Sequence, residues 1–168
     1  MNMGKNIILN SIEIKHITKR IAYQIYETFV DEQEIIIAGI SKNGFEFAKK
    51  IAEEIEKISS LQLVLCEVTI QKDNVFAPIQ TSLQPLDYQN KGVILVDDVL
   101  NSGATLIYGV KHFLNVPLKK FKTAVLVDRN HKKYPVKVDF KGISLSTSSQ
   151  EHVEVIFEKE NDVAFLTN

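Results

Sequence analysis

The run from Val93 to Leu106 constrains the fold of this chain more than any other segment. It begins with the apolar residues 93–96, continues through the adjacent acids Asp97 and Asp98, and reaches the small residues 101–105. An uninterrupted apolar strand is typical of the middle of a parallel sheet, because both faces of such a sheet are covered. We therefore predict an α/β fold in which this run forms a buried strand, a tight turn and the start of a helix.

The turn in this run has the features of a phosphate site. Gly103 permits a sharp backbone turn, and Ser102 and Thr105 carry hydroxyl donors. Backbone amides at a helix N-terminus point at an anion. Asp97 and Asp98 lie where open α/β sheets bind their ligands, and neighbouring strand residues face opposite sides, so we expect different roles for them. The combination predicts a receptor for a ribose 5-phosphate.

Residues 96–105 resemble the signature of type I phosphoribosyltransferases, which bind phosphoribosyl pyrophosphate. The likeness extends over about residues 17–156 and is similar to one branch, the bacterial pyrimidine-operon attenuators that are also uracil phosphoribosyltransferases. The other segments that carry it are 17–25, 38–40, 124–131, 138–142, 146–148 and 151–155. The resemblance implies a central, mostly parallel β-sheet flanked by helices, a small hood over the base site (about 128–153) and a flexible lid loop (about 72–91).

Length and composition fit one domain over residues 1–168. With 20 basic and 21 acidic residues, the chain lacks the overall positive charge that favours binding to nucleic acid. The single cysteine, Cys66, excludes an internal disulfide and fits a reducing compartment. No N-terminal apolar stretch reaches the length of a signal peptide or membrane span, so we expect a cytoplasmic protein without a membrane partner.

Hydrophobic periodicity predicts the remaining elements. Helices are expected from Ser11 to about Val30, with a capping box between Asn10 and Glu13, and over 45–58 and 104–114. Strands are expected over 7–9, 34–40, 61–71, 92–96 and 123–127, with weaker signals at 136–143 and 153–157. Residues 41–44 are predicted as a turn and 72–90 as a long loop, the length of which is typical of a lid or a disordered segment.

The resemblance also implies roles for individual residues. Asp97 and Asp98 would engage the ribose hydroxyls, directly or through a hydrated Mg²⁺ that arrives with the substrate, and Lys72 of the lid would complete the catalytic set. The 5-phosphate loop would be Asn101, Ser102, Gly103, Ala104 and Thr105, and the pyrophosphate loop Ser41, Lys42, Asn43 and Gly44. The base would lie against Asp128, Arg129, Phe140, Lys141 and Ile143, although Phe140 fits a core position equally well.

Three residues depart from the family pattern. Asn43 stands where the attenuator branch has an arginine, and Lys72 replaces another arginine, keeping the charge but losing the bidentate fork. Asn101 occupies a position where several purine-specific relatives carry an acid. An amide is no general base, and because uracil N1–H is comparatively acidic, Asn101 fits uracil better than a purine.

Three functions are therefore compatible with the sequence. The first is an enzyme that transfers ribose 5-phosphate from phosphoribosyl pyrophosphate to a nucleobase, uracil being favoured, with release of pyrophosphate. The second is a nucleotide-sensing regulator that binds pyrimidine-operon messenger RNA, weakly because few phosphates would be neutralised. The third is a nucleotide-binding relic without turnover. The resemblance also predicts a homodimer or homotetramer.

Overall fold

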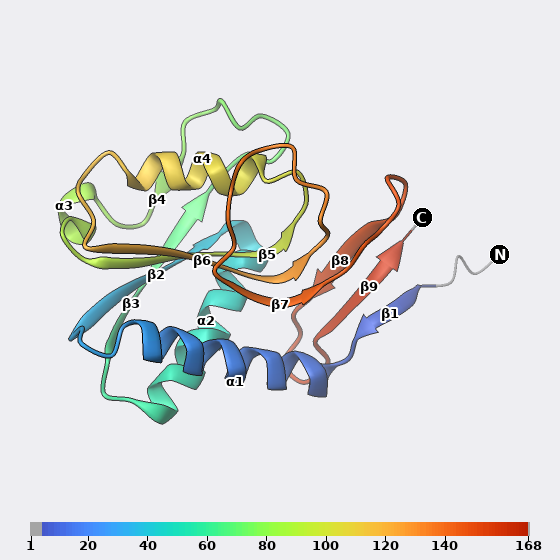
Figure 1. Ribbon diagram of the computed structural model, residues 1–168, viewed down its shortest axis with the longest axis horizontal. Coiled ribbons are helices and arrows are strands. Elements are labelled where there is room, and N and C mark those ends of the chain that lie inside the picture. Colours follow the sequence, from blue (N-terminus) through green and yellow to red (C-terminus); the bar gives the residue numbers. More distant parts are fainter. Residues whose placement is uncertain (1–4, 168) are drawn as a thin grey trace.

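The centre of the computed structural model, which describes residues 5–167, is a six-stranded β-sheet (Figure 1). Its strands are β2 (Glu34–Ile40), β3 (Gln62–Thr69), β4 (Gln80–Thr81), β5 (Gly92–Leu100), β6 (Lys120–Asp128) and β7 (Phe140–Ser144). The order is β4-β3-β2-β5-β6-β7; β4 pairs antiparallel with β3, and every other pairing is parallel. The predicted α/β fold with a mostly parallel central sheet is confirmed.

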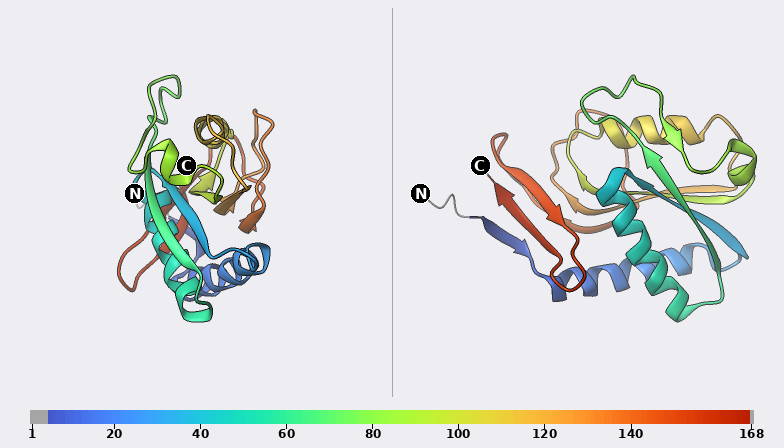
Figure 2. Two further views of the ribbon diagram at one scale, coloured as in Figure 1. Left: turned by 90° about the vertical axis from the view of Figure 1, so that its left-hand side faces the viewer. Right: turned by 180° about the vertical axis from the view of Figure 1, so that it is seen from behind.

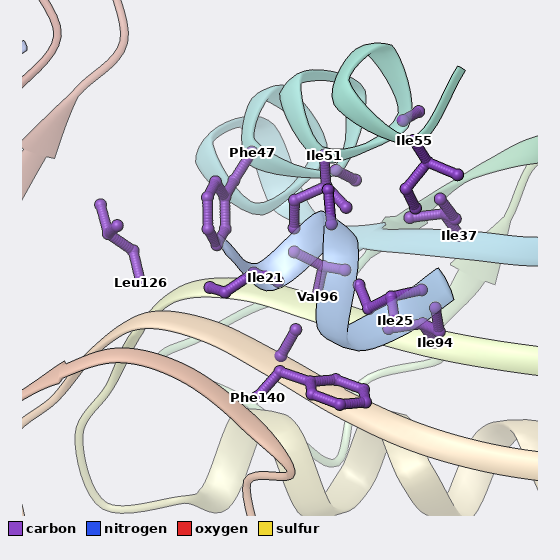
Figure 3. Close-up of a cluster of buried hydrophobic side chains, with 14 of the residues drawn as sticks. Ile21, Ile25, Ile37, Phe47, Ile51, Ile55, Ile94, Val96, Leu126 and Phe140 are labelled. Carbon is purple, nitrogen blue, oxygen red and sulfur yellow. The ribbon is translucent and has the colours of Figure 1, made fainter. Parts of the chain in front are cut away.

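Helices cover both faces of this sheet. The helices are α1 (Ser11–Thr28), α2 (Ser41–Ile58), the short α3 (Pro85–Tyr88) and α4 (Ala104–Phe113). Figure 1 shows α1 and α2 on one side of the sheet and α4 on the other. Figure 3 shows the core on the first side, where Phe47 and Ile51 of α2 and Ile21 of α1 face strand residues such as Val96. Because both faces are packed, all nine residues of β5 are buried.

The start of α1 follows from its sequence. The Asn10 side chain accepts from the Glu13 amide at 3.0 Å, and the Glu13 carboxylate accepts from the Asn10 amide at 2.8 Å. This reciprocal pair satisfies two amides that a helix end leaves without partners, which confirms the predicted capping box. Ile14, Ile21 and Ile25 are fully buried on the apolar stripe of the helix.

A second sheet of three antiparallel strands stands beside the first (Figures 1 and 2). It contains β1 (Asn6–Leu9), β8 (His152–Ile156) and β9 (Val163–Thr167) in the order β1-β9-β8. The sequence did not predict β9. The segment predicted as a hood, 128–153, is divided between the two sheets, because β7 extends the central sheet and β8 begins the second one.

Three local predictions were wrong. Residues 41–44 form the first turn of α2 rather than a separate turn, because Ser41 takes a left-handed φ of 56° that reverses the chain directly after β2. Strand β5 runs on to Leu100 and includes both acids. The predicted loop 72–90 contains β4 and α3, and Tyr88 of α3 is fully buried against Phe113, with ring centroids 4.8 Å apart.

Candidate functional site

A pocket opens at the carboxyl end of β5. Its lining combines the end of that strand with the turn into α4 and one lysine from the loop after β3: Lys72, Asp97, Val99, Leu100, Asn101, Ser102, Gly103, Thr105, Leu106 and Val125. Six of the residues predicted from the sequence meet here, namely Lys72, Asp97, Asn101, Ser102, Gly103 and Thr105. Parallel sheets bind ligands at this edge, where strand ends and helix N-termini converge.

The turn into α4 has the geometry of an anion site. Gly103 has a φ of +86°, a conformation that residues with a Cβ rarely adopt, and a Cβ there would lie 2.8 Å from Val136 Cγ1. The Ser102 hydroxyl accepts a hydrogen bond from the Ala104 amide at 3.2 Å. The Ser102 carbonyl accepts from the amides of Lys133 and Tyr134, at 2.7 and 3.2 Å, which fixes the turn against the chain after β6.

The two acids of β5 share one cation but face different neighbours. Lys72 Nζ lies 3.5 Å from Asp97 Oδ1 and 3.7 Å from Asp98 Oδ1. Asp97 lines the pocket, whereas Asp98 Oδ2 accepts from the Asn43 side chain of α2 at 3.0 Å. The expectation that the two acids face opposite sides is met only in part, since both lie near Lys72, and their different roles stay a prediction.

Burial and charge set the protonation of this cluster. Burial, together with the neighbouring Asp98 carboxylate, raises the pKa of Asp97 well above its ordinary value, and Lys72 opposes that shift. For Lys72, partial burial lowers the pKa of the ammonium, but Asp97 and Asp98 outweigh it and leave the pKa raised. The ammonium therefore stays charged and compensates a pair of carboxylates that repel each other.

Asp97 and Asp98 have the oxygen chemistry of a site that would hold Mg²⁺ together with the phosphates of a ligand. Carboxylate oxygens suit Mg²⁺, and the Lys72 ammonium between Asp97 and Asp98 marks a place where a cation is stabilised. Within residues 5–167 no group of three or more histidine, cysteine or acidic side chains is placed to hold a metal. Two carboxylates without further protein ligands match the way in which Mg²⁺ is held jointly with substrate phosphates.

The loop predicted for pyrophosphate lies beside the pocket, at the start of α2. Lys42 is exposed, and Gly44 is buried so closely that a Cβ would meet the Val96 carbonyl at 2.8 Å. Asn43 is turned inward, donating to Asp98 and, at 2.9 Å, to the Val155 carbonyl of β8. In this structure Asn43 therefore holds an acid of the site, a role that the sequence did not reveal.

The residues predicted for the base lie on β6 and β7. Asp128 is buried, and its carboxylate accepts from the Asn130 amide at 2.9 Å and lies 3.6 Å from Lys141 Nζ. Phe140 is 8% exposed and belongs to the core cluster that includes residues of α1. Ile143 is partly buried and packs against this cluster. For Phe140 the structure favours the core position that the sequence left open. None of these residues lines the pocket at β5.

Two arginines hydrogen-bond β7 and the segment after it, close to the residues predicted for the base. The sequence did not predict this supporting role for either arginine. Arg20 of α1 donates to the carbonyls of Lys141 and Gly142, at 3.1 and 2.7 Å. Arg129, expected to contact the base, instead donates to Asn101, Thr147, Ser148 and Glu151. The run of serine and threonine residues after β7 offers many oxygen acceptors, and it is the feature of the sequence that could have indicated partners for Arg129 within the protein.

Comparisons with known proteins show the family of this chain. Residues 5–158 match the family model of the phosphoribosyl transferase domain. The bifunctional protein PyrR of Streptococcus thermophilus is 32% identical over 157 residues, which cover 92% of this chain and 91% of that protein. The protein of the same name from Streptococcus mutans is 33% identical over 161 residues, which cover 92% of each chain.

Solved structures with little sequence identity share the fold. The hypoxanthine phosphoribosyltransferase of Trypanosoma cruzi superposes with a TM-score of 0.78 at 15% identity, covering 100% of both chains. A hypoxanthine-guanine phosphoribosyltransferase from Bacillus anthracis gives 0.72 at 20% identity, covering 86% of this chain and 84% of that one. Because the family model matches residues 5–158 and the two curated relatives are 32% and 33% identical across most of both chains, this chain belongs to the type I phosphoribosyltransferase family.

Proposed function

We propose that this protein transfers ribose 5-phosphate from phosphoribosyl pyrophosphate to uracil and releases pyrophosphate. The observation that carries the proposal is the meeting of Lys72 and Asp97 with residues 101–103 and Thr105 in one pocket at the end of β5. A buried acid suited to ribose hydroxyls stands beside amides and hydroxyls suited to a phosphate. Membership of the phosphoribosyltransferase family supports this assignment.

Each part of the pocket then has a role. The loop 102–105 binds the 5-phosphate, Asp97 and Asp98 bind the ribose hydroxyls, and Lys72 moves from these acids toward the pyrophosphate, assisted by Lys42. The protein acts by positioning its substrates and by stabilising charge as the bond to pyrophosphate breaks. Bound Mg²⁺ would supply further neutralisation of the phosphates at Asp97 and Asp98. The loop after β3 excludes water from the electron-poor ribosyl carbon.

The choice of uracil rests on Asn101. Its amide cannot take a proton, and its oxygen already accepts from Arg129 at 2.8 Å. Several purine-specific relatives carry an acid at this place, which serves the departing proton of the base, and Asn101 cannot take that role. The resemblance to pyrimidine-operon attenuators that are also uracil phosphoribosyltransferases supports the same base.

A substrate panel tests the proposal. Pyrophosphate release is measured with phosphoribosyl pyrophosphate, Mg²⁺ and, separately, uracil, hypoxanthine, guanine, xanthine and orotate. We expect release with uracil and little with the other four bases. Release with a purine alone would refute the choice of base, and silence with all five would favour a binding protein without turnover.

A regulator that binds messenger RNA is the second candidate, and the curated relatives named bifunctional protein PyrR favour it. Lys15 and Lys19 are exposed on α1, but Arg20 is engaged with the carbonyls of β7. One of the three cations on α1 is therefore engaged within the protein, and we expect the affinity for RNA to be low. A low-salt gel shift with a pyrimidine-leader RNA tests this, with and without uridine monophosphate; tight, nucleotide-dependent binding would place regulation first.

The setting of the protein is also part of the proposal. No helix within residues 5–167 is long and apolar enough to cross a membrane. We place the enzyme in the cytoplasm as a homodimer or homotetramer. Cell fractionation and light scattering during size-exclusion chromatography test these two points, and a monomer at micromolar concentration would contradict the second.

A further inference from the structure

Arg129 connects two segments that are distant in sequence. Arg129 is 6% exposed and directly follows β6. The guanidinium donates hydrogen bonds to four oxygens: Asn101 Oδ1 at 2.8 Å, Thr147 Oγ1 at 3.0 Å, the Ser148 carbonyl at 3.3 Å, and the Glu151 carbonyl. The first belongs to the 5-phosphate loop, and the other three belong to residues 145–151, which join β7 to β8 and are called the base-side segment below.

The base-side segment is held mainly where it meets the end of β6. The Leu145 amide donates to the Asp128 carbonyl at 2.8 Å, and the His131 ring contacts the Thr147 carbonyl. Within the segment, the Ser148 amide donates to the Glu151 carboxylate at 2.7 Å. Among residues 5–167, Arg129 is the side chain that hydrogen-bonds both this segment and the 5-phosphate loop.

The charge of Arg129 adds a second argument. No salt bridge within the described chain includes this arginine, and all four of its hydrogen-bond acceptors are neutral oxygens. The hydrogen bond from Ser148 lowers the pKa of Glu151, and the charge of Arg129 also helps to lower it. A buried charge of this kind depends on all its hydrogen bonds, because each lost acceptor leaves the cation less well solvated. A change in the position of Asn101 therefore alters the hydrogen bonds that the guanidinium makes to the other three oxygens.

We propose that Arg129 is a positioning residue that links the 5-phosphate loop to the base-side segment, so that ordering one favours ordering the other. This rests on the proposed function, which gives the two segments their ligands. A ribose phosphate that fixes the loop raises the affinity of the site for uracil, and uracil raises the affinity for the ribose phosphate by the same factor.

The link is tested first without any ligand, by amide hydrogen exchange on the full chain. Asn101→Ala removes one acceptor at an exposed position and leaves the other three in place. We expect exchange at the Leu145 and Ser148 amides, more than 40 residues away in sequence, to become at least about threefold faster. The control Lys132→Ala removes a neighbouring exposed cation and leaves these amides unchanged. Faster exchange in residues 101–105 alone would overturn the proposal.

The second test measures coupling directly by calorimetry. Ribose 5-phosphate is titrated into the wild type with and without saturating uracil, and we expect uracil to tighten binding about fivefold or more. Arg129→Lys keeps the cation but loses the planar fork, so the factor should fall to about one. An unchanged factor in this variant would overturn the link. If the wild type binds neither compound, the proposed function fails, and the exchange experiment on Asn101→Ala still decides the link.

Discussion

The two sides of the candidate site are built in different ways. The phosphate side is one continuous run of chain, in which β5 leads through Gly103 into α4 and the turn is shaped by its own backbone. The side proposed for pyrophosphate and the base is assembled from distant segments: Asn43 reaches Val155 across 112 residues, and Arg20 reaches Gly142 across 122. One side of the site therefore depends on residues that are neighbours in the chain, and the other depends on contacts between distant segments. Substitutions on the two sides should have different effects.

Asp97 stands between the two sides, and its substitution should have the largest effect. Asp97→Asn removes the pocket's buried carboxylate, and we expect about a 100- to 1,000-fold loss of turnover. Because its pKa is raised, the folded protein binds this proton more tightly than the unfolded chain does. Stability from this group is complete below the ordinary pKa of an aspartate and is lost as pH rises through the raised value.

The same variant should consequently be more stable than the wild type at neutral pH, by about 1 kcal/mol. Thermal unfolding across a pH series checks this. The difference in stability between the variant and the wild type should be small in acid, where Asp97 is neutral, and should increase as pH rises. Asp73→Asn, which alters an exposed acid next to Lys72, is the control. A stability loss at neutral pH in Asp97→Asn would contradict this account.

Gly103→Ala tests the local side. The methyl group must be accommodated at a φ of +86°, which costs about 1–2 kcal/mol of stability, and it also meets Val136. We expect that loss in urea unfolding and a weaker affinity for ribose 5-phosphate in calorimetry. Gly109→Ala, within α4, is the steric control, because its Cβ would also meet a side chain, Leu95 Cδ2 at 2.9 Å, but without a positive φ. Equal losses in both variants would contradict a special role for the turn.

Asn43→Ala tests the tertiary side. The substitution removes the Asn43 donor from Asp98 Oδ2 and detaches α2 from the Val155 carbonyl. We expect a loss of about 1–3 kcal/mol in the free energy of unfolding and a fall in turnover of about tenfold. Lys57→Ala removes an exposed ion pair on the same helix and should change neither quantity. Full activity in Asn43→Ala would show that Asp98 needs no such support.

Arg20→Ala should have the smallest effect. The arginine is exposed, and two hydrogen bonds to β7 carbonyls of a solvent-facing edge contribute about 1 kcal/mol together. We expect a rise in KM for uracil of a few-fold with kcat nearly unchanged. Lys19→Ala, the adjacent exposed cation, is the control, and a larger change in kcat than in KM would argue against this support of the base side.

What the sequence predicts follows the same division. The strand, the turn and the helix of the phosphate side were predicted because each depends on residues that are neighbours in the chain, such as the glycine at the turn. The strand β9 was missed, since its place depends on pairing with β1 and β8, which no local pattern reveals. Likewise, an arginine after a strand gives no indication whether it meets a ligand or, as Arg129 does, four oxygens of the protein.

The central claim is that the turn into α4 receives the 5-phosphate of a phosphoribosyl donor. Crystals soaked with phosphoribosyl pyrophosphate and Mg²⁺ test it most directly. The account predicts density for that phosphate against the amides of residues 102–105, with the ribose beside Asp97. Ordered donor bound elsewhere, with this turn left vacant, would contradict it.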